Sequence, residues 1–210
     1  MEHTSSRAWL FAVMAVIGAV VFAYATGVLM GPFAPLLGDR LPELTCLQIA
    51  FSAERAADVL GAFSPEQHVA IAGLLVPGDM VFAWGYGLLL TGLLGLLTLR
   101  LPAGWQPIGR VLMWTPLLAS VLDCIEDLFL YQIVVGFPGG EPGLAPLLAG
   151  IAATLKYLNL SVLAPGYGVA GSIRGLGHDR RFGALLIYAL VLVNALAFVA
   201  KPLQQIPPCF

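Results

Sequence analysis

Residues 70–99 read AIAGLLVPGDMVFAWGYGLLLTGLLGLLTL, a stretch in which Asp79 is the only charged side chain. About 20 mostly apolar residues in a helix are enough to cross the ~30 Å hydrocarbon core of a bilayer. With 30 residues, this stretch is longer than the length required, so it predicts a membrane-spanning helix. Other apolar stretches of the chain can be compared with it.

Four further stretches have the same apolar character, and each ends near glycine, proline or a basic residue, as helices commonly do. We therefore expect an all-α fold, in which residues 1–210 form a single transmembrane domain: a bundle of five transmembrane helices with a short amphipathic outer helix. The predicted spans are residues 8–30, 70–99, 111–136, 144–164 and 182–200, and residues 31–67 form an outer segment.

The composition of the chain excludes several classes of protein. Ten basic and twelve acidic residues among 210, with 59% hydrophobic residues, are far too few charges for a soluble globular domain. The abundance of large apolar side chains excludes a disordered chain. With a net charge of −2 and no run of basic residues, nucleic-acid binding is not expected. The expected partners are the lipid bilayer and, as a further candidate, other membrane-protein subunits.

The basic residues predict the orientation of the helices. The first stretch could be a signal peptide, since Ala23-Tyr24-Ala25 resembles a cleavage site, but its apolar run continues to Met30, so we expect a retained span. Short cytoplasmic loops carry an excess of Lys and Arg. A cytoplasmic N-terminus and an outside C-terminus put six basic residues inside and three outside. The six are Arg7, Arg100, Arg110, Arg174, Arg180 and Arg181, and the three are Arg40, Arg55 and Lys201.

The outer segment contains two helix starts. Ser52 is a candidate N-cap, and after it apolar residues recur at helical spacing from Ala56 to Phe63, which predicts an amphipathic helix lying on the membrane surface rather than one that binds a partner. Ser64-Pro65-Glu66-Gln67 is a capping box that starts the next helix. Cys46 and Cys209 are both expected outside, where a disulfide between them is a further hypothesis.

Ionisable residues within the spans are the most informative feature, because each is costly in hydrocarbon and normally faces the interior of the bundle. Asp123, Glu126 and Asp127 share one face of the third span, near the bilayer centre. Lys156 in the fourth span and Asp79 in the second reach similar depths. Two polar residues accompany them: Asn159 shares the face of Lys156, and Tyr86 shares the face of Asp79.

These residues predict an ion pair inside the bundle. The third and fourth spans are joined by a short loop and should pack as antiparallel neighbours, so Lys156 should contact Asp123 or Glu126. Four acids and one lysine cannot all be ionised in hydrocarbon, so at least one acid is expected to hold a proton. The cluster is either a structural clasp or a functional site, and Asp79, after Pro77-Gly78, either caps the lower half-helix or belongs to the cluster.

The order of several motifs resembles that of a known group of proteins. These are Phe51-Ser52-Ala53-Glu54-Arg55-Ala56, Asp79 with Tyr86, Asp123-Cys124-Ile125-Glu126, and Lys156. Over residues 44–165 the chain resembles an uncharacterised family of small bacterial multi-span membrane proteins with an Asp-x-x-Glu-Asn motif in the third span. Here Asp127 stands where that motif has Asn. The resemblance implies the architecture, an importance for the cluster and a bacterial inner membrane, but no activity.

Motifs for familiar chemistry are missing from the sequence. There is no Cys-x-x-Cys, no Gly-x-Ser-x-Gly, no His-Glu-x-x-His and no phosphate-binding loop. The acids could bind a hard cation such as Mg²⁺, but Lys156 at the same depth argues against a metal. We therefore assign no catalytic residue, no metal and no cofactor, and lean against an enzyme. The first hypothesis is a non-catalytic accessory or structural subunit of a membrane complex; the alternatives are a proton-coupled transporter and a lipid-modifying membrane enzyme.

Overall fold

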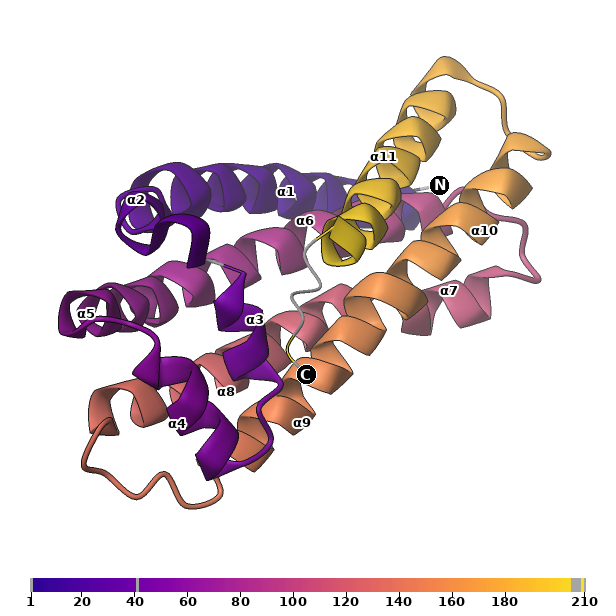
Figure 1. Ribbon diagram of the computed structural model, residues 1–210. Coiled ribbons are helices and arrows are strands. Elements are labelled where there is room, and N and C mark those ends of the chain that lie inside the picture. Colours follow the sequence, from indigo (N-terminus) through magenta and orange to yellow (C-terminus); the bar gives the residue numbers. More distant parts are fainter. Residues whose placement is uncertain (1, 41, 205–208, 210) are drawn as a thin grey trace.

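The computed structural model describes residues 2–40, 42–204 and 209, and all of their regular secondary structure is helical (Figure 1). The predicted all-α class is therefore confirmed. Five helices form the body of the molecule, with a sixth continuing one of them. They are α1 (Glu2–Tyr24), α6 (Met80–Thr98), α8 (Thr115–Gly136), α9 (Ala145–Leu158), its continuation α10 (Ala164–Leu176), and α11 (Phe182–Gln204).

The helices pack in a simple order. Helix α6 contacts α1, α8 and α11, helix α8 also packs against α9, and α10 pairs with α11 (Figure 1). Helix α6 can contact so many neighbours because its glycines allow close approach. At Gly85 an added Cβ would collide with the backbone of Phe22 in α1, and at Gly18 it would collide with the backbone of Leu89 in α6. Small residues are what membrane helices use to bring backbones together.

Three wider, π-helical segments interrupt the long helices, and they are η1 (Ala25–Met30), η3 (Leu74–Asp79) and η4 (Asn159–Leu163). Segment η3 contains a true break, because Val76 has extended backbone angles (φ −129°, ψ 114°). Pro77 explains this break: proline disfavours a helical conformation in the residue before it and has no N–H to donate. Segment η4 carries the helix into α10 past Pro165, where the sequence predicted the fourth span to end.

Three helices among the described residues are long and apolar enough to cross a membrane, fewer than the five spans predicted. They are Ser6–Met30, Pro65–Thr98 and Ala145–Leu176. They indicate a membrane protein. Helix α8 has the length to cross but carries three acids, and it begins at Thr115 instead of residue 111 because a separate helix, α7 (Gln106–Leu112), precedes it. The apolar part of α11 described in full, Phe182–Ala197, is shorter.

The outer segment covers one end of the bundle and also packs against α8 and α9. It contains α2 (Ala34–Leu37), the 3₁₀ turn η2 (Gly38–Arg40), α3 (Glu43–Gln48), α4 (Ala53–Gly61) and the start of α5 (Pro65–Gly73). The predicted N-cap at Ser52 and the capping box at Ser64 are both confirmed. The expectation for α4 needs correction, however. Its apolar residues Ala56 and Leu60 are fully buried against the chain's own core, which includes Ile133 of α8, instead of facing lipid.

Two contacts tie segments that are far apart in the sequence. Cys46 of α3 forms a disulfide with Cys209, 163 residues later, as hypothesised. At the opposite end of the bundle, Asp179 accepts a hydrogen bond from the backbone N–H of Arg181 (3.1 Å) and forms an ion pair with Arg100 (3.3 Å). The N–H of Arg181, followed by the charges of Arg181 and Arg100, lowers the pKa of Asp179 below its ordinary value of 3.8.

Candidate functional site

Helix α8 supplies the centre of the site. Asp123, Glu126 and Asp127 fall at positions i, i+3 and i+4, so they lie on one face of the helix, as predicted. That face points at α6 and α9, and the three side chains are 3%, 0% and 0% exposed. Asp123 lies about 12 Å along the helix from Thr115, and Asp127 about 14 Å from Gly136. The acids are therefore deep in the bundle.

Lys156 of α9 connects two of these acids. Its Nζ lies 2.6 Å from Oδ1 of Asp123 and 2.6 Å from Oε2 of Glu126, and the lysine is 4% exposed. The predicted ion pair is therefore confirmed, with both candidate partners engaged at once. The ammonium also lies 4.9 Å from the ring centre of Tyr157, within the range of a cation–π contact. The burial of this charge is offset by close contact with opposite charge.

Helix α6 contributes a second donor to Asp123. The hydroxyl of the buried Tyr86 donates a hydrogen bond to Oδ2 of Asp123 (2.8 Å), so each carboxylate oxygen of Asp123 has one partner. Nearby, Ser120 of α8 donates to the carbonyl of Ala83 in α6 (2.6 Å). These two bonds hold α6 and α8 in register where they carry the site. The sequence placed Tyr86 on the right face but gave it no partner.

Asp79 and Asp127 complete the cluster. Carboxylate oxygens of Asp79, Asp123 and Asp127 all lie within 4.8 Å of one another. Asp79 stands at the end of the η3 break, and its side chain makes no capping bond to α6, so of its two predicted roles membership of the cluster is the one that the geometry shows. Both oxygens of Asp127 are buried and have no hydrogen-bond partner among the described residues.

Asn159, the last residue predicted for the site, does not join this network. It is buried, but its amide donates to the carbonyl of Leu155 in its own helix (2.7 Å). Asn side chains in helices commonly bond to the backbone one turn earlier when no tertiary partner is in reach. The residue makes no described contact with an acid of the site.

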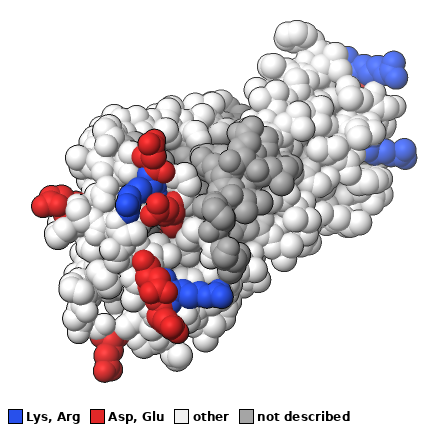
Figure 2. Space-filling model, viewed as in Figure 1, with Lys and Arg blue, Asp and Glu red and all other residues white. Residues whose placement is uncertain are grey.

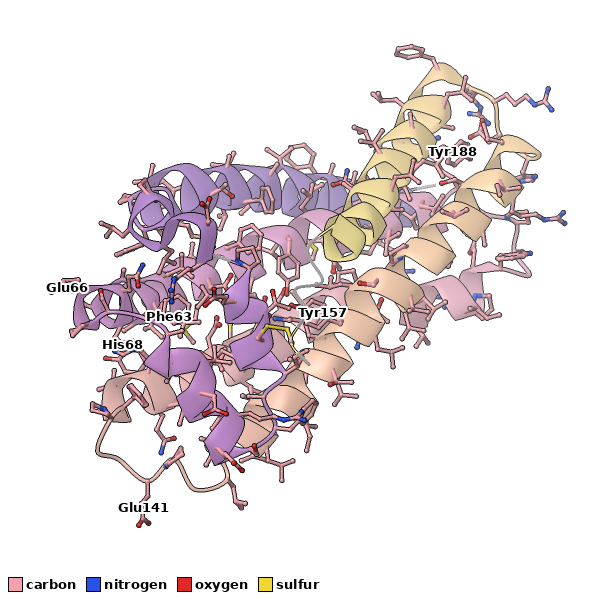
Figure 3. The ribbon with its side chains drawn as sticks, viewed as in Figure 1. Phe63, Glu66, His68, Glu141, Tyr157 and Tyr188 are labelled. Atoms are coloured by element: carbon pink, nitrogen blue, oxygen red, sulfur yellow. A yellow bond between two sulfur atoms is a disulfide. The ribbon has the colours of Figure 1, made fainter. Side chains whose placement is uncertain are left out.

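One connection was missed by sequence reasoning. Tyr157 donates a hydrogen bond to Oε1 of Gln48 in α3 (2.6 Å), which links the outer segment to the residue next to Lys156 (Figure 3). Figure 3 shows Tyr157 near the middle of the molecule, away from the labelled residues Glu66 and His68 at one end. The adjacency of Tyr157 and Lys156 was visible in the sequence. The position of Gln48, in a six-residue helix, was not.

The described charges of the site do not balance. Four carboxylates gather around one ammonium: Asp79, Asp123, Glu126 and Asp127 around Lys156. A buried carboxylate without a partner is costly, so further positive charge, a proton or a bound cation, is needed there. Comparison of the chain with protein-family models, with curated proteins and with solved structures finds no match. The function is therefore inferred from the site itself.

Proposed function

We propose that the chain is an integral membrane protein with five spans, formed by α1, α5–α6, α8, α9–α10 and α11. Although α8 carries three acids, their burial against α6 and α9 leaves apolar residues on its exposed face, which supports α8 as a span. Helix α11 supports the same architecture, because it continues to Gln204 and reaches 23 residues.

The arrangement of the ends supports a cytoplasmic N-terminus and an outside C-terminus. The N-terminus, α7 and the α10–α11 loop lie at one end of the bundle, and α2, α4 and the loop after α8 lie at the other (Figure 1). On the face shown in Figure 2, charged side chains gather at the two ends, with an uncharged described surface between them. The disulfide between Cys46 and Cys209 requires an oxidising compartment, as expected for the outside of a bacterial inner membrane.

We propose that the protein is a cation-coupled membrane transporter, which broadens the proton-coupled alternative drawn from the sequence. One observation carries this proposal: Asp127 is fully buried, and neither of its oxygens has a hydrogen-bond donor among the described residues. A clasp between α8 and α9 needs only Lys156 and its two partners. An additional carboxylate weakens such a clasp, but it provides a place for a mobile positive charge.

Two further features support transport over the alternatives. The span that carries Asp79 is broken beside it, and broken spans near the bilayer centre are where secondary transporters bind ions. A lipid-modifying enzyme would need its acids near the headgroups, whereas these acids lie deep in the bundle. The accessory-subunit role and the family resemblance stay predictions. Stoichiometric copurification of another membrane protein would support the accessory role.

The test is charge movement in reconstituted membranes. Purified protein in liposomes is exposed to a sudden change of pH, Na⁺, Mg²⁺ or Ca²⁺, and charge displacement is recorded on a supported membrane. The wild type should move charge for at least one of these cations. Asp127→Asn should abolish that signal, and Asp58→Asn, which neutralises an exposed acid on α4, should keep it. A wild type that moves no charge with any cation, protons included, contradicts the proposal.

A further inference from the structure

We propose that Asp79, Asp123 and Asp127 form a binding site for a hard divalent cation of calcium size. This inference rests on the proposed transport function and names the cation that the site takes. The three residues come from two spans, α8 and the broken span that contains η3. Their carboxylate oxygens lie within 4.8 Å of one another. Three such oxygens are a common core of an all-oxygen cation site.

The state of Asp127 is the second observation that points to a ligand. The residue is 0% exposed, both of its oxygens are without a hydrogen-bond partner among the described residues, and one of them faces the other two acids. Native proteins pair nearly all such buried polar atoms. A cation held between the three carboxylates would supply the missing partner of Asp127.

The lysine does not block this site. The sequence argued against a metal because Lys156 lies at the same depth as the acids. In the structure its ammonium contacts Oδ1 of Asp123 and Oε2 of Glu126. Its described ion pairs do not include Asp127. Lys156 therefore neutralises one edge of the acidic cluster. On the opposite edge, Asp127 has no described counter-charge.

Charge and size select the cation. Carboxylate oxygens favour hard cations over zinc or copper. The four acids and Lys156 sum to −3, which a divalent cation reduces to −1 and a monovalent cation only to −2. The three oxygens lie within 4.8 Å of one another, so a cation at their centre lies at most about 2.8 Å from each, which leaves room for calcium at ~2.3–2.6 Å. Magnesium usually keeps several of its waters and is seldom held by protein carboxylates alone, so a buried carboxylate site favours calcium.

The first experiment uses the full chain purified in detergent and stripped of metal with a chelator. Equilibrium dialysis with radioactive Ca²⁺ should give one bound ion per chain. Ca²⁺ at about 100 times its dissociation constant should raise the thermal midpoint by ~5 °C or more. Mg²⁺ and Na⁺, at matched ionic strength, should compete weakly. Binding of Na⁺ or Mg²⁺ in preference to Ca²⁺ overturns the assignment.

Two buried acids of α8 provide a matched pair of variants. Asp127→Asn removes the negative charge and one of the two oxygens of this side chain, and it should weaken Ca²⁺ binding at least ~10-fold. Glu126→Gln removes the same charge from an equally buried neighbour outside the triangle and should weaken binding clearly less than Asp127→Asn does. If both variants lose binding equally, total charge and not the triangle determines binding, and the proposed site is wrong. If Asp127→Asn does not fold, the wild-type stoichiometry and cation preference decide.

The outcomes separate this inference from the proposed function. Charge movement driven by protons without Ca²⁺ binding overturns the calcium site and leaves cation-coupled transport standing. Ca²⁺ binding without charge movement for any cation overturns the proposed transport function. The calcium site then stands, in a protein that is not a transporter.

Discussion

Lys156 is held by two carboxylates, and this makes its contribution asymmetric. Removing one acid leaves the ammonium with the other, whereas removing the lysine leaves two buried carboxylates without their counter-ion. Breaking a buried pair in this way costs about 3–5 kcal/mol in soluble proteins, because the remaining charge stays buried. Loss of Lys156 should therefore destabilise the protein more than loss of either acid that it contacts.

We expect Lys156→Met to destabilise the protein by several kcal/mol, about 3–5, and Asp123→Asn to cost clearly less. Thermal unfolding in detergent, followed by circular dichroism, measures both. The double variant should recover part of the loss, but not all of it, because Glu126 stays uncompensated. Equal losses from the two single variants would mean that the pair with Glu126 contributes nothing.

Asp179 predicts a pH dependence outside the membrane. Its pKa is lowered by the Arg181 N–H and by the charges of Arg181 and Arg100, so its ionised form stabilises the fold. A lowered folded-state pKa gives stability that is present above the unfolded value of about 3.9 and is lost as the pH falls through the folded value. Asp179→Asn should lower the thermal midpoint slightly at pH 7. The difference from wild type should shrink as the pH is lowered below about 3.9, through the lowered pKa of Asp179.

At the scale of elements, the contact between α1 and α6 depends on glycine. Gly18→Ala places a methyl group against the backbone of Leu89, which cannot move away as a flexible side chain could. We expect a loss of about 1–3 kcal/mol. Gly27→Ala is the matched control, since its added Cβ meets nothing within 4 Å. Thermal midpoints of the two variants decide, and an unchanged midpoint for Gly18→Ala would argue against close packing of these helices.

Local signals in the sequence predicted the elements well. Hydrophobic length located the long helices, and the side chains of Ser52 and Ser64 marked two helix starts correctly. Two properties of an element depended on tertiary structure: the residue at which a helix ends and the direction in which its apolar face points. Helix α4 turns its apolar residues to the chain's own core because α5 and the end of α8 offer them a surface. Pro165 does not end a helix, since the wider turn of η4 precedes it.

The site was predictable only where local sequence patterns determine it. Helical spacing put the three acids of α8 on one face, and the short loop after α8 brought Lys156 to them. The choice between two roles for Asp79 depended on whether α6 used it as a cap, which backbone geometry decides. The contact between Tyr157 and Gln48 joins residues 109 positions apart. No local pattern marks such a pair.

For the whole molecule, the topology can be tested with single cysteines. In a Cys124→Ser background, Asp58→Cys on α4 and Arg181→Cys in the α10–α11 loop lie on exposed positions at opposite ends of the bundle. In intact cells, a maleimide that cannot cross the inner membrane should label the cysteine at position 58, and the one at 181 only after permeabilisation. Labelling of both in intact cells would contradict the five-span topology.

The cysteines give a second test at this scale. The chain has three, of which Cys124 is free and the other two are paired. Alkylation of the denatured protein should therefore add one group without reductant and three with it, as read by intact mass. Three groups without reductant would show that Cys46 and Cys209 are not oxidised in the protein as purified.

The disulfide between Cys46 and Cys209 also changes the covalent connectivity of the chain from linear to partly circular. It closes residues 46–209 into a covalent ring of 164 residues, which contains α4 to α11 and leaves α1 and α2 outside it. Cutting any one loop inside the ring therefore opens the ring without releasing a fragment, so a nicked protein keeps its full mass until it is reduced. In the proposed topology the ring can close only after α11 has carried Cys209 across the membrane. Its closure therefore reports, on a non-reducing gel, that a chain has been threaded completely.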